Sequence, residues 1–148
     1  MDGKRRVALV TGGMGGIGTA ISRRLCATGH VVIAGCGPGS QRRERWLTEM
    51  RAEGHEVYSA AGNVADWDST RGAIERARGE AGEVDVLVNN AGITRDGTFR
   101  KMSNEQWHQV IETNLNSLFH VTKQVIDGML DRGWGRIINI SSVNGQRG

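Results

Sequence analysis

A glycine-rich stretch near the start of the chain has the residue types and spacing of a phosphate-binding turn. Residues 11–18 read Thr-Gly-Gly-Met-Gly-Gly-Ile-Gly, directly after the apolar run Val7–Val10. Gly12 can adopt the positive φ of a sharp turn, Gly16 lets a phosphate approach the backbone, and Gly18 lets a helix pack closely on its strand. The free N–H groups at the start of such a helix carry partial positive charge. The stretch therefore predicts a strand, a turn that binds a pyrophosphate, and a helix from Thr19 to Ala27.

The second apolar run ends in small residues where many dinucleotide sites carry an acidic one. An Asp or Glu there accepts hydrogen bonds from a ribose 2′-hydroxyl, whereas residues 35–37, Gly-Cys-Gly, place nothing acidic against a 2′-phosphate. Ser40, Arg42 and Arg43 follow, and a guanidinium can hold a phosphate through paired charge-assisted bonds. Arg42 is the first candidate; the alternative is that these arginines form only the exposed start of a helix. The pattern favours NADPH over NADH.

Five short apolar runs alternate with segments of helical spacing. The runs begin at Val7, Val31, Val57, Val84 and Ile137, and the segments between them are long enough for helices. Strands buried on both faces of a parallel sheet are continuously apolar, and alternation with helices indicates βαβ units. We expect one α/β domain over residues 1–148, a Rossmann-type doubly wound parallel sheet with strand order 3-2-1-4-5. Ligands then bind beyond the carboxyl ends of the strands.

Composition argues against several classes of function. Nineteen Lys and Arg against sixteen Asp and Glu give a net charge of +3, spread over the chain, so we expect no nucleic-acid partner. The apolar runs are too short to span a bilayer and no secretory segment precedes the first, so we expect no membrane partner and a cytoplasmic location. The four histidines and the two cysteines, Cys26 and Cys36, lack metal-ligand spacing, and we expect no metal.

Three further motifs follow the glycine-rich stretch along the chain. Asn89-Asn90-Ala91-Gly92 comes directly after the fourth run, Asn114 lies where a long apolar helix is expected to begin, and Asn139-Ile140-Ser141-Ser142 ends the fifth run. Together with residues 11–18, these motifs resemble the short-chain dehydrogenase/reductase family, from about Arg6 to the last residue. The resemblance implies an oxidoreductase in which a nicotinamide cofactor delivers hydride to a carbonyl carbon.

The resemblance also implies which residues hold the cofactor. The glycine-rich turn would line the pyrophosphate, and the segment after the fourth strand would run beside the adenosine ribose. Many relatives carry Asp where this chain has Asn63, but an amide or a neighbouring backbone N–H can pair with adenine without a charge. Asn63 can also be a plain turn residue. The expected cofactor-binding residues are Gly12, Gly15, Gly16, Ile17, Gly18, Ser40, Arg42, Asn63, Val64, Asn90, Ala91 and Gly92.

Ser142 and Asn114 are the catalytic residues that the resemblance implies. In the family, serine and tyrosine hydroxyls hold the carbonyl oxygen, a lysine lowers the pKa of the tyrosine, and an asparagine holds a water of the proton relay. The Tyr-x-x-x-Lys pair of the family would lie beyond Gly148, and Tyr58 has no lysine four residues on. We therefore expect residues 1–148 to be the amino-terminal part of a reductase, without its carboxy-terminal strands and inactive by themselves.

Several stretches resemble one group of the family, the acetoacetyl-CoA reductases of polyhydroxyalkanoate synthesis. The stretches are residues 11–20, 34–38, 62–68, 91–96 and 132–136. The group implies an acyl-CoA thioester substrate, with Asp96 at the mouth of the cleft, and a homotetramer at full length; Asp96 can equally be a turn residue. The alternatives are a 3-oxoacyl-[acyl-carrier-protein] reductase and a nucleotide-binding module without catalysis. The apolar helix expected over Asn114–Arg132 is either deeply packed or meets another subunit.

Overall fold

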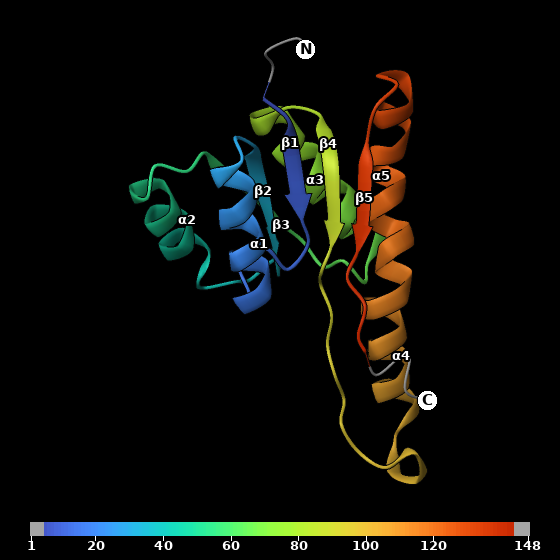
Figure 1. Cartoon of the computed structure of the whole chain (residues 1–148). Coiled ribbons are helices and arrows are strands. Elements are labelled where there is room, and N and C mark those ends of the chain that lie inside the picture. The colour runs from blue at the N-terminus through green and yellow to red at the C-terminus, as the bar shows by residue number, and fades with distance from the viewer. Residues whose placement is uncertain (1–4, 144–148) are drawn as a thin grey trace.

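The computed structural model describes residues 5–143, which form a five-stranded sheet flanked by helices (Figure 1). The first part of the chain consists of β1 (Val7–Val10), α1 (Gly16–Ala27), β2 (Val31–Cys36), α2 (Arg43–Ala52), β3 (Val57–Ala61), α3 (Trp67–Ala81) and β4 (Val84–Asn89). The second part consists of a 3-10 helix η1 (Phe99–Lys101), α4 (Asn104–Ile111), a π-helix η2 (Glu112–Asn116), α5 (Ser117–Asp131) and β5 (Arg136–Asn139). All neighbouring strands are parallel, in the order β3-β2-β1-β4-β5. The predicted fold class and strand order are confirmed.

Helices cover both faces of the sheet because successive side chains of each strand point to opposite faces. Leu9 belongs to a buried cluster that contains Ile74 of α3 and Val121 of α5. Its neighbour Val10 belongs to a second cluster that contains Trp46 of α2, with Leu25 of α1 packed against it. Burial of each such side chain contributes about 1.5–3 kcal/mol relative to exposure. β1 is therefore buried along its whole length and forms the centre of the fold.

β5 is exposed, unlike the strands before it. All four of its residues are exposed, with Ile137 at 38% and Ile138 at 48%. Within residues 5–143 it pairs with β4 alone and forms one edge of the sheet. An apolar edge strand offers unpaired backbone groups to other chains.

The long apolar helix predicted over Asn114–Arg132 consists of two elements. The π-helix η2 ends at Asn116, and α5 begins at Ser117. Val121 and Val125 of α5 are buried against the sheet, whereas Phe119 is 65% exposed. Deep packing, one of the two alternatives for this helix, therefore applies to one of its faces. Among the described residues, no helix has both the length and the apolar character needed to cross a bilayer.

Candidate functional site

The glycine-rich turn connects β1 to α1 with little space for side chains. Gly12 has a φ of 61°, and a Cβ on Gly18 would lie 2.0 Å from the carbonyl oxygen of Gly12, so both positions require glycine. A Cβ on Gly16 would meet nothing within 4 Å, which leaves open space at the start of the helix. The helix begins at Gly16 rather than at the predicted Thr19, because the Thr19 N–H donates to the carbonyl oxygen of Gly15 (2.8 Å) and closes the first turn.

Thr11 ties the glycine-rich turn to the end of β4. Its hydroxyl oxygen accepts hydrogen bonds from the backbone N–H groups of Asn90 and Ala91, both at 2.9 Å. The Asn90 amide donates in return to the carbonyl oxygens of Thr11 (3.1 Å) and Gly12 (3.4 Å). Thr11 is not among the predicted site residues, although a buried polar residue directly after an apolar strand is a signal that sequence reasoning could have used.

A cavity of about 620 Å³ lies over the start of α1. It brings together ten of the twelve predicted cofactor-binding residues, namely Gly12, Gly15, Gly16, Ile17, Gly18, Ser40, Arg42, Asn90, Ala91 and Gly92. The residues come from the β1–α1 turn and the first turn of α1, the segment between β2 and α2, and the segment that follows β4. The wall therefore combines backbone N–H groups at a helix start with one guanidinium, a combination suited to phosphate groups.

Arg42 spans from α2 to the glycine-rich turn. Its guanidinium donates a hydrogen bond to the carbonyl oxygen of Met14, and the residue directly precedes α2. Arg43, the first residue of α2, pairs instead with the carboxylate of Glu44 (2.9 Å). Arg42 is thus at the exposed start of a helix and also lines the cavity. The two predicted alternatives, a phosphate-binding residue and an exposed helix start, are therefore compatible at this position.

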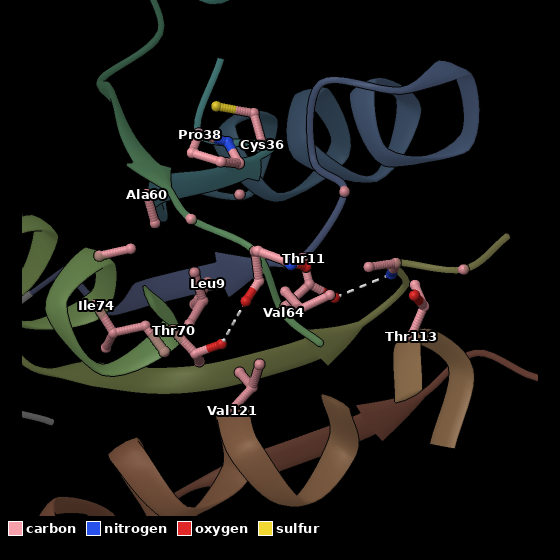
Figure 2. Close-up of a pocket in the computed structure, with 18 of the residues that line it drawn as sticks. Leu9, Thr11, Cys36, Pro38, Ala60, Val64, Thr70, Ile74, Thr113 and Val121 are labelled. Carbon is pink, nitrogen blue, oxygen red and sulfur yellow. Dashed lines mark hydrogen bonds between the residues drawn. The ribbon is translucent and has the colours of Figure 1, made fainter. Parts of the chain in front are cut away.

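A second cavity of about 300 Å³ adjoins the first and contains the other two predicted residues, Asn63 and Val64 (Figure 2). The Asn63 Oδ1 atom accepts a hydrogen bond from the Ala65 N–H (3.1 Å), which closes a local turn. The Asn63 carbonyl oxygen accepts another from the Thr70 hydroxyl (3.0 Å), drawn as a dashed line in Figure 2. Asn63 is therefore a turn residue and a cavity residue at once. Val121 of α5 also lines this cavity, on the side far from Cys36 and Pro38 (Figure 2).

Cys36 lines both cavities, and the sequence analysis did not assign it to the site. Burial raises the pKa of its thiol, and the nearby Arg43 guanidinium opposes that rise to a smaller extent. The thiol is therefore protonated at neutral pH and contributes apolar surface rather than charge. Cys26 lies in α1, where burial also raises the pKa of the thiol. Within the described range, no three or more His, Cys, Asp or Glu residues are grouped as metal ligands.

Asn114 lies in the π-helix η2, not at the start of a regular helix as predicted. Its Oδ1 atom accepts a hydrogen bond from the Ile93 N–H, and its Nδ2 group donates to the Ile93 carbonyl oxygen, both at 2.8 Å. A Cβ on Gly92 would lie 3.5 Å from the Asn114 Oδ1 atom, so the loop and η2 are in close contact. π-helical turns are frequent at functional sites because they reorient a side chain. Here η2 directs Asn114 at the segment after β4.

Ser142 and Asp96 lie outside both cavities. Ser142 follows β5 and is exposed, and Asp96 is exposed in the loop between β4 and η1, which runs beyond the carboxyl edge of the sheet (Figure 1).

The ends of β4 and β5 are joined by a hydrogen bond between side chains that the sequence analysis did not predict. The Asn89 amide donates to the Asn139 Oδ1 atom at 2.9 Å, and Asn89 is only 5% exposed.

Comparison with protein families identifies residues 6–148 as a short chain dehydrogenase. The chain belongs to the short-chain dehydrogenase/reductase family. The predicted resemblance to this family of oxidoreductases, based in part on the glycine-rich turn, the segment after β4 and Asn114, is confirmed.

Individual short-chain dehydrogenases and reductases are similar over nearly the whole chain. The acetoacetyl-CoA reductase of Cupriavidus necator is 65% identical over 144 residues, which are 97% of this chain and 58% of that enzyme. The 3-oxoacyl-[acyl-carrier-protein] reductase FabG of Escherichia coli is 42% identical over 148 residues, 59% of its length. The crystal structure of an F189W actinorhodin polyketide ketoreductase with NADPH is 40% identical, with a TM-score of 0.92 over 97% of this chain and 56% of that one. The chain thus spans somewhat more than half the length of these relatives.

Proposed function

We propose that this chain is the NADP-binding domain of an NADPH-dependent reductase that converts acetoacetyl-CoA to 3-hydroxybutyryl-CoA. The observation that carries the proposal is the pair of adjoining cavities at the carboxyl ends of β1, β2 and β4, lined by the glycine-rich turn, Arg42, Asn63 and the segment after β4. Ligands of doubly wound sheets bind at this edge. The relative in complex with NADPH supports the choice of cofactor.

The residues present fit a phosphorylated dinucleotide. The open space beside Gly16 allows a pyrophosphate to approach the start of α1 without meeting a Cβ. No acidic residue lies at the end of β2, where Cys36 and Gly37 line the cavity. Arg42 lines the same cavity and would bind the 2′-phosphate. Asn63 and Val64 would hold the adenine in the smaller cavity. When bound, the nicotinamide supplies hydride to the substrate carbonyl.

The carbonyl-reducing end would be formed by Asn114, Ser142 and Asp96. We assign Ser142 to donate a hydrogen bond to the carbonyl oxygen, Asn114 to hold a water of the proton relay, and Asp96 to contact the substrate. Tyr58 cannot be the proton donor, because it lies on β3, at the opposite edge of the sheet from β5, and its hydroxyl donates to the Glu56 carboxylate (3.4 Å). The acid of the reaction would therefore come from residues beyond those described.

The substrate assignment follows the relatives. The acetoacetyl-CoA reductase of Cupriavidus necator shares 65% identity, against 42% for the acyl-carrier-protein reductase of Escherichia coli, and on that ground we favour coenzyme A over carrier protein. The second candidate is the carrier-protein thioester, since both relatives cover the same residues. The third is a nucleotide-binding module without catalysis, for which the two cavities suffice by themselves.

A homotetramer is the proposed assembly of the full-length reductase. Leu115, Phe119 and Leu130 are 58%, 65% and 69% exposed on and beside α5, and a second subunit would remove this apolar surface from water. Light scattering of the full-length protein should give four times the subunit mass. A monomer would contradict the assignment.

The test uses the protein expressed from its complete reading frame. NADPH oxidation is followed with acetoacetyl-CoA and, in parallel, with acetoacetyl-acyl-carrier protein, and NADH replaces NADPH in a second pair of assays. The proposal predicts the highest kcat/KM with NADPH and acetoacetyl-CoA. Preference for the carrier-protein thioester would favour the second candidate, and NADPH binding without turnover would favour the third.

A further inference from the structure

The loop between β3 and α3 forms one wall of the smaller cavity, and it is braced by the start of α3. The Asn63 N–H donates to the Ser69 hydroxyl oxygen (2.9 Å), and the Asp66 carboxylate accepts from the Ser69 N–H (2.7 Å) as the N-cap of α3. Gly62 packs so closely that a Cβ there would lie 2.7 Å from the Cβ of Ala73. These contacts all come from neighbouring residues of the chain.

His120 of α5 adds a contact from a distant part of the sequence. Its Nδ1 atom lies 3.0 Å from the carbonyl oxygen of Val64, 56 residues earlier in the chain. Because a carbonyl oxygen can only accept, the proton of this hydrogen bond belongs to Nδ1 of the imidazole. The imidazole ring also lies edge-on to Trp67 (5.9 Å between centroids, 83°) and to Phe119 (6.3 Å, 66°). The hydrogen bond and the two rings together define the orientation of the imidazole.

The same turn of α5 also reaches the cavity directly. Val121, the next residue, is 1% exposed, lines the cavity and points toward Thr70 and Val64 (Figure 2). Helix α5 therefore contributes apolar surface to the cavity through Val121 and holds the Val64 segment of its lining through His120. Both contacts act on the part of the site assigned to adenine.

We propose that His120 is a positioning residue for the adenine end of the nucleotide site. By donating to the Val64 carbonyl oxygen, it fixes the Val64–Ala65 peptide and so the side of the cavity against which the base packs. The inference rests on the proposed function, since it requires a dinucleotide in this site. Loss of the bond frees the loop to occupy other conformations, and binding must then order it again. The weakening is confined to ligands that carry adenine.

Two substitutions separate the hydrogen bond from the ring packing. His120→Phe keeps an aromatic ring beside Trp67 and Phe119 but has no donor, whereas His120→Asn keeps an N–H donor and loses the ring. Two probes separate the ends of the site. Adenosine 2′,5′-bisphosphate carries the base and the 2′-phosphate, and reduced nicotinamide mononucleotide carries the other half of the cofactor. Binding of both is measured by calorimetry on the protein expressed from its complete reading frame.

We expect His120→Phe to weaken adenosine 2′,5′-bisphosphate about fivefold, the size of one lost hydrogen bond, and to leave nicotinamide mononucleotide unchanged. His120→Asn should stay within about twofold of the wild type for both probes. In steady-state assays, His120→Phe should raise the KM for NADPH by the same factor with kcat unchanged. Should His120→Phe fail to fold, as judged by thermal unfolding, His120→Ala takes its place with the same expected weakening.

Other results would overturn the inference. Wild-type affinity for adenosine 2′,5′-bisphosphate in His120→Phe would show that the hydrogen bond does not contribute to binding. If His120→Asn weakened binding of this probe as much as His120→Phe does, the effect would come from the ring. Equal weakening of both probes would show a general structural effect. Failure of the wild-type protein to bind adenosine 2′,5′-bisphosphate would overturn the proposed function, and this inference with it.

Discussion

The two ends of the candidate site differ in how their residues are held. At the glycine-rich turn, Thr11 and Asn90 exchange several hydrogen bonds, and Gly18 packs against Gly12 without room for a Cβ on Gly18. At the other end, Ser142 follows an edge strand whose residues are all exposed, and Asp96 lies on an exposed loop. Asn114 is the exception there, because two hydrogen bonds hold it to Ile93.

This difference reflects which parts of the chain build each end. The nucleotide end uses mainly β1, β2 and β4, which are largely buried and paired on both sides within the sheet, together with the residues that follow the edge strand β3. The carbonyl end depends on β5, which has a neighbour on one side in the described part of the chain. Nucleotide binding and turnover should therefore respond differently to the same changes, and four predictions use that contrast.

The largest effect is expected on turnover by residues 1–148 expressed alone. They should bind NADPH but reduce acetoacetyl-CoA at least about 100-fold more slowly than the Cupriavidus necator enzyme, since a positioned acid contributes about 10²–10⁴-fold to such a step. A serine hydroxyl such as that of Ser142 is a poor proton source at neutral pH. NADPH binding by fluorescence and oxidation by absorbance give the two readouts, with gel filtration to monitor pairing through β5. Turnover within about tenfold of the full-length enzyme would contradict the expected difference between nucleotide binding and turnover.

The next effect is on the stability of the nucleotide end. Gly18→Ala should lower the free energy of unfolding by about 2–3 kcal/mol, because its Cβ would lie 2.0 Å from the Gly12 carbonyl oxygen and the backbone would have to shift. Gly16→Ala is the matched control, since its Cβ would meet nothing within 4 Å. Gly16→Ala should leave the unliganded protein as stable as the wild type and weaken NADPH. Urea unfolding checks both, and equal stability of the two variants would contradict the packing argument.

A smaller effect is expected on cofactor choice. Arg42→Ala should weaken NADPH about tenfold and NADH little, because one guanidinium bond to a charged phosphate is lost. Arg43→Ala is the control on the next residue, whose guanidinium pairs with Glu44. The test is to measure the dissociation constants of NADPH and NADH for both variants of the full-length protein. Equal weakening of NADPH and NADH by Arg42→Ala would remove the 2′-phosphate assignment.

The smallest effect is expected at the exposed loop. Asp96→Ala should raise the KM for acetoacetyl-CoA about threefold, in line with one exposed polar contact, and leave the KM for NADPH unchanged. Asp131→Ala, at the exposed end of α5, serves as the control. An unchanged KM for acetoacetyl-CoA in Asp96→Ala would make the residue an ordinary loop aspartate. A raised KM for NADPH would mean that the two ends of the site are not independent.

Local spacing in the sequence was sufficient to predict the sheet and the glycine-rich turn. The apolar runs at Val7 and Val31 predicted strands because burial on both faces demands continuous apolar residues. The need for glycine at Gly12 and Gly18 was also predictable, since it arises from a turn of a few residues. Helix and strand ends were less accurate, as the start of α1 shows, because the energy of one additional turn is small.

Contacts between distant residues could be decided only by the tertiary structure. Thr11 meets Ala91 across 80 positions of the chain, and Asn89 meets Asn139 across 50, because parallel pairing brings the carboxyl ends of successive strands to one edge of the sheet. His120 meets Val64 because α5 packs beside α3 on the same face. A sequence pattern records which face of its own helix or strand a residue occupies. The partner on another element depends on the crossover and register of the whole sheet, which no local pattern contains.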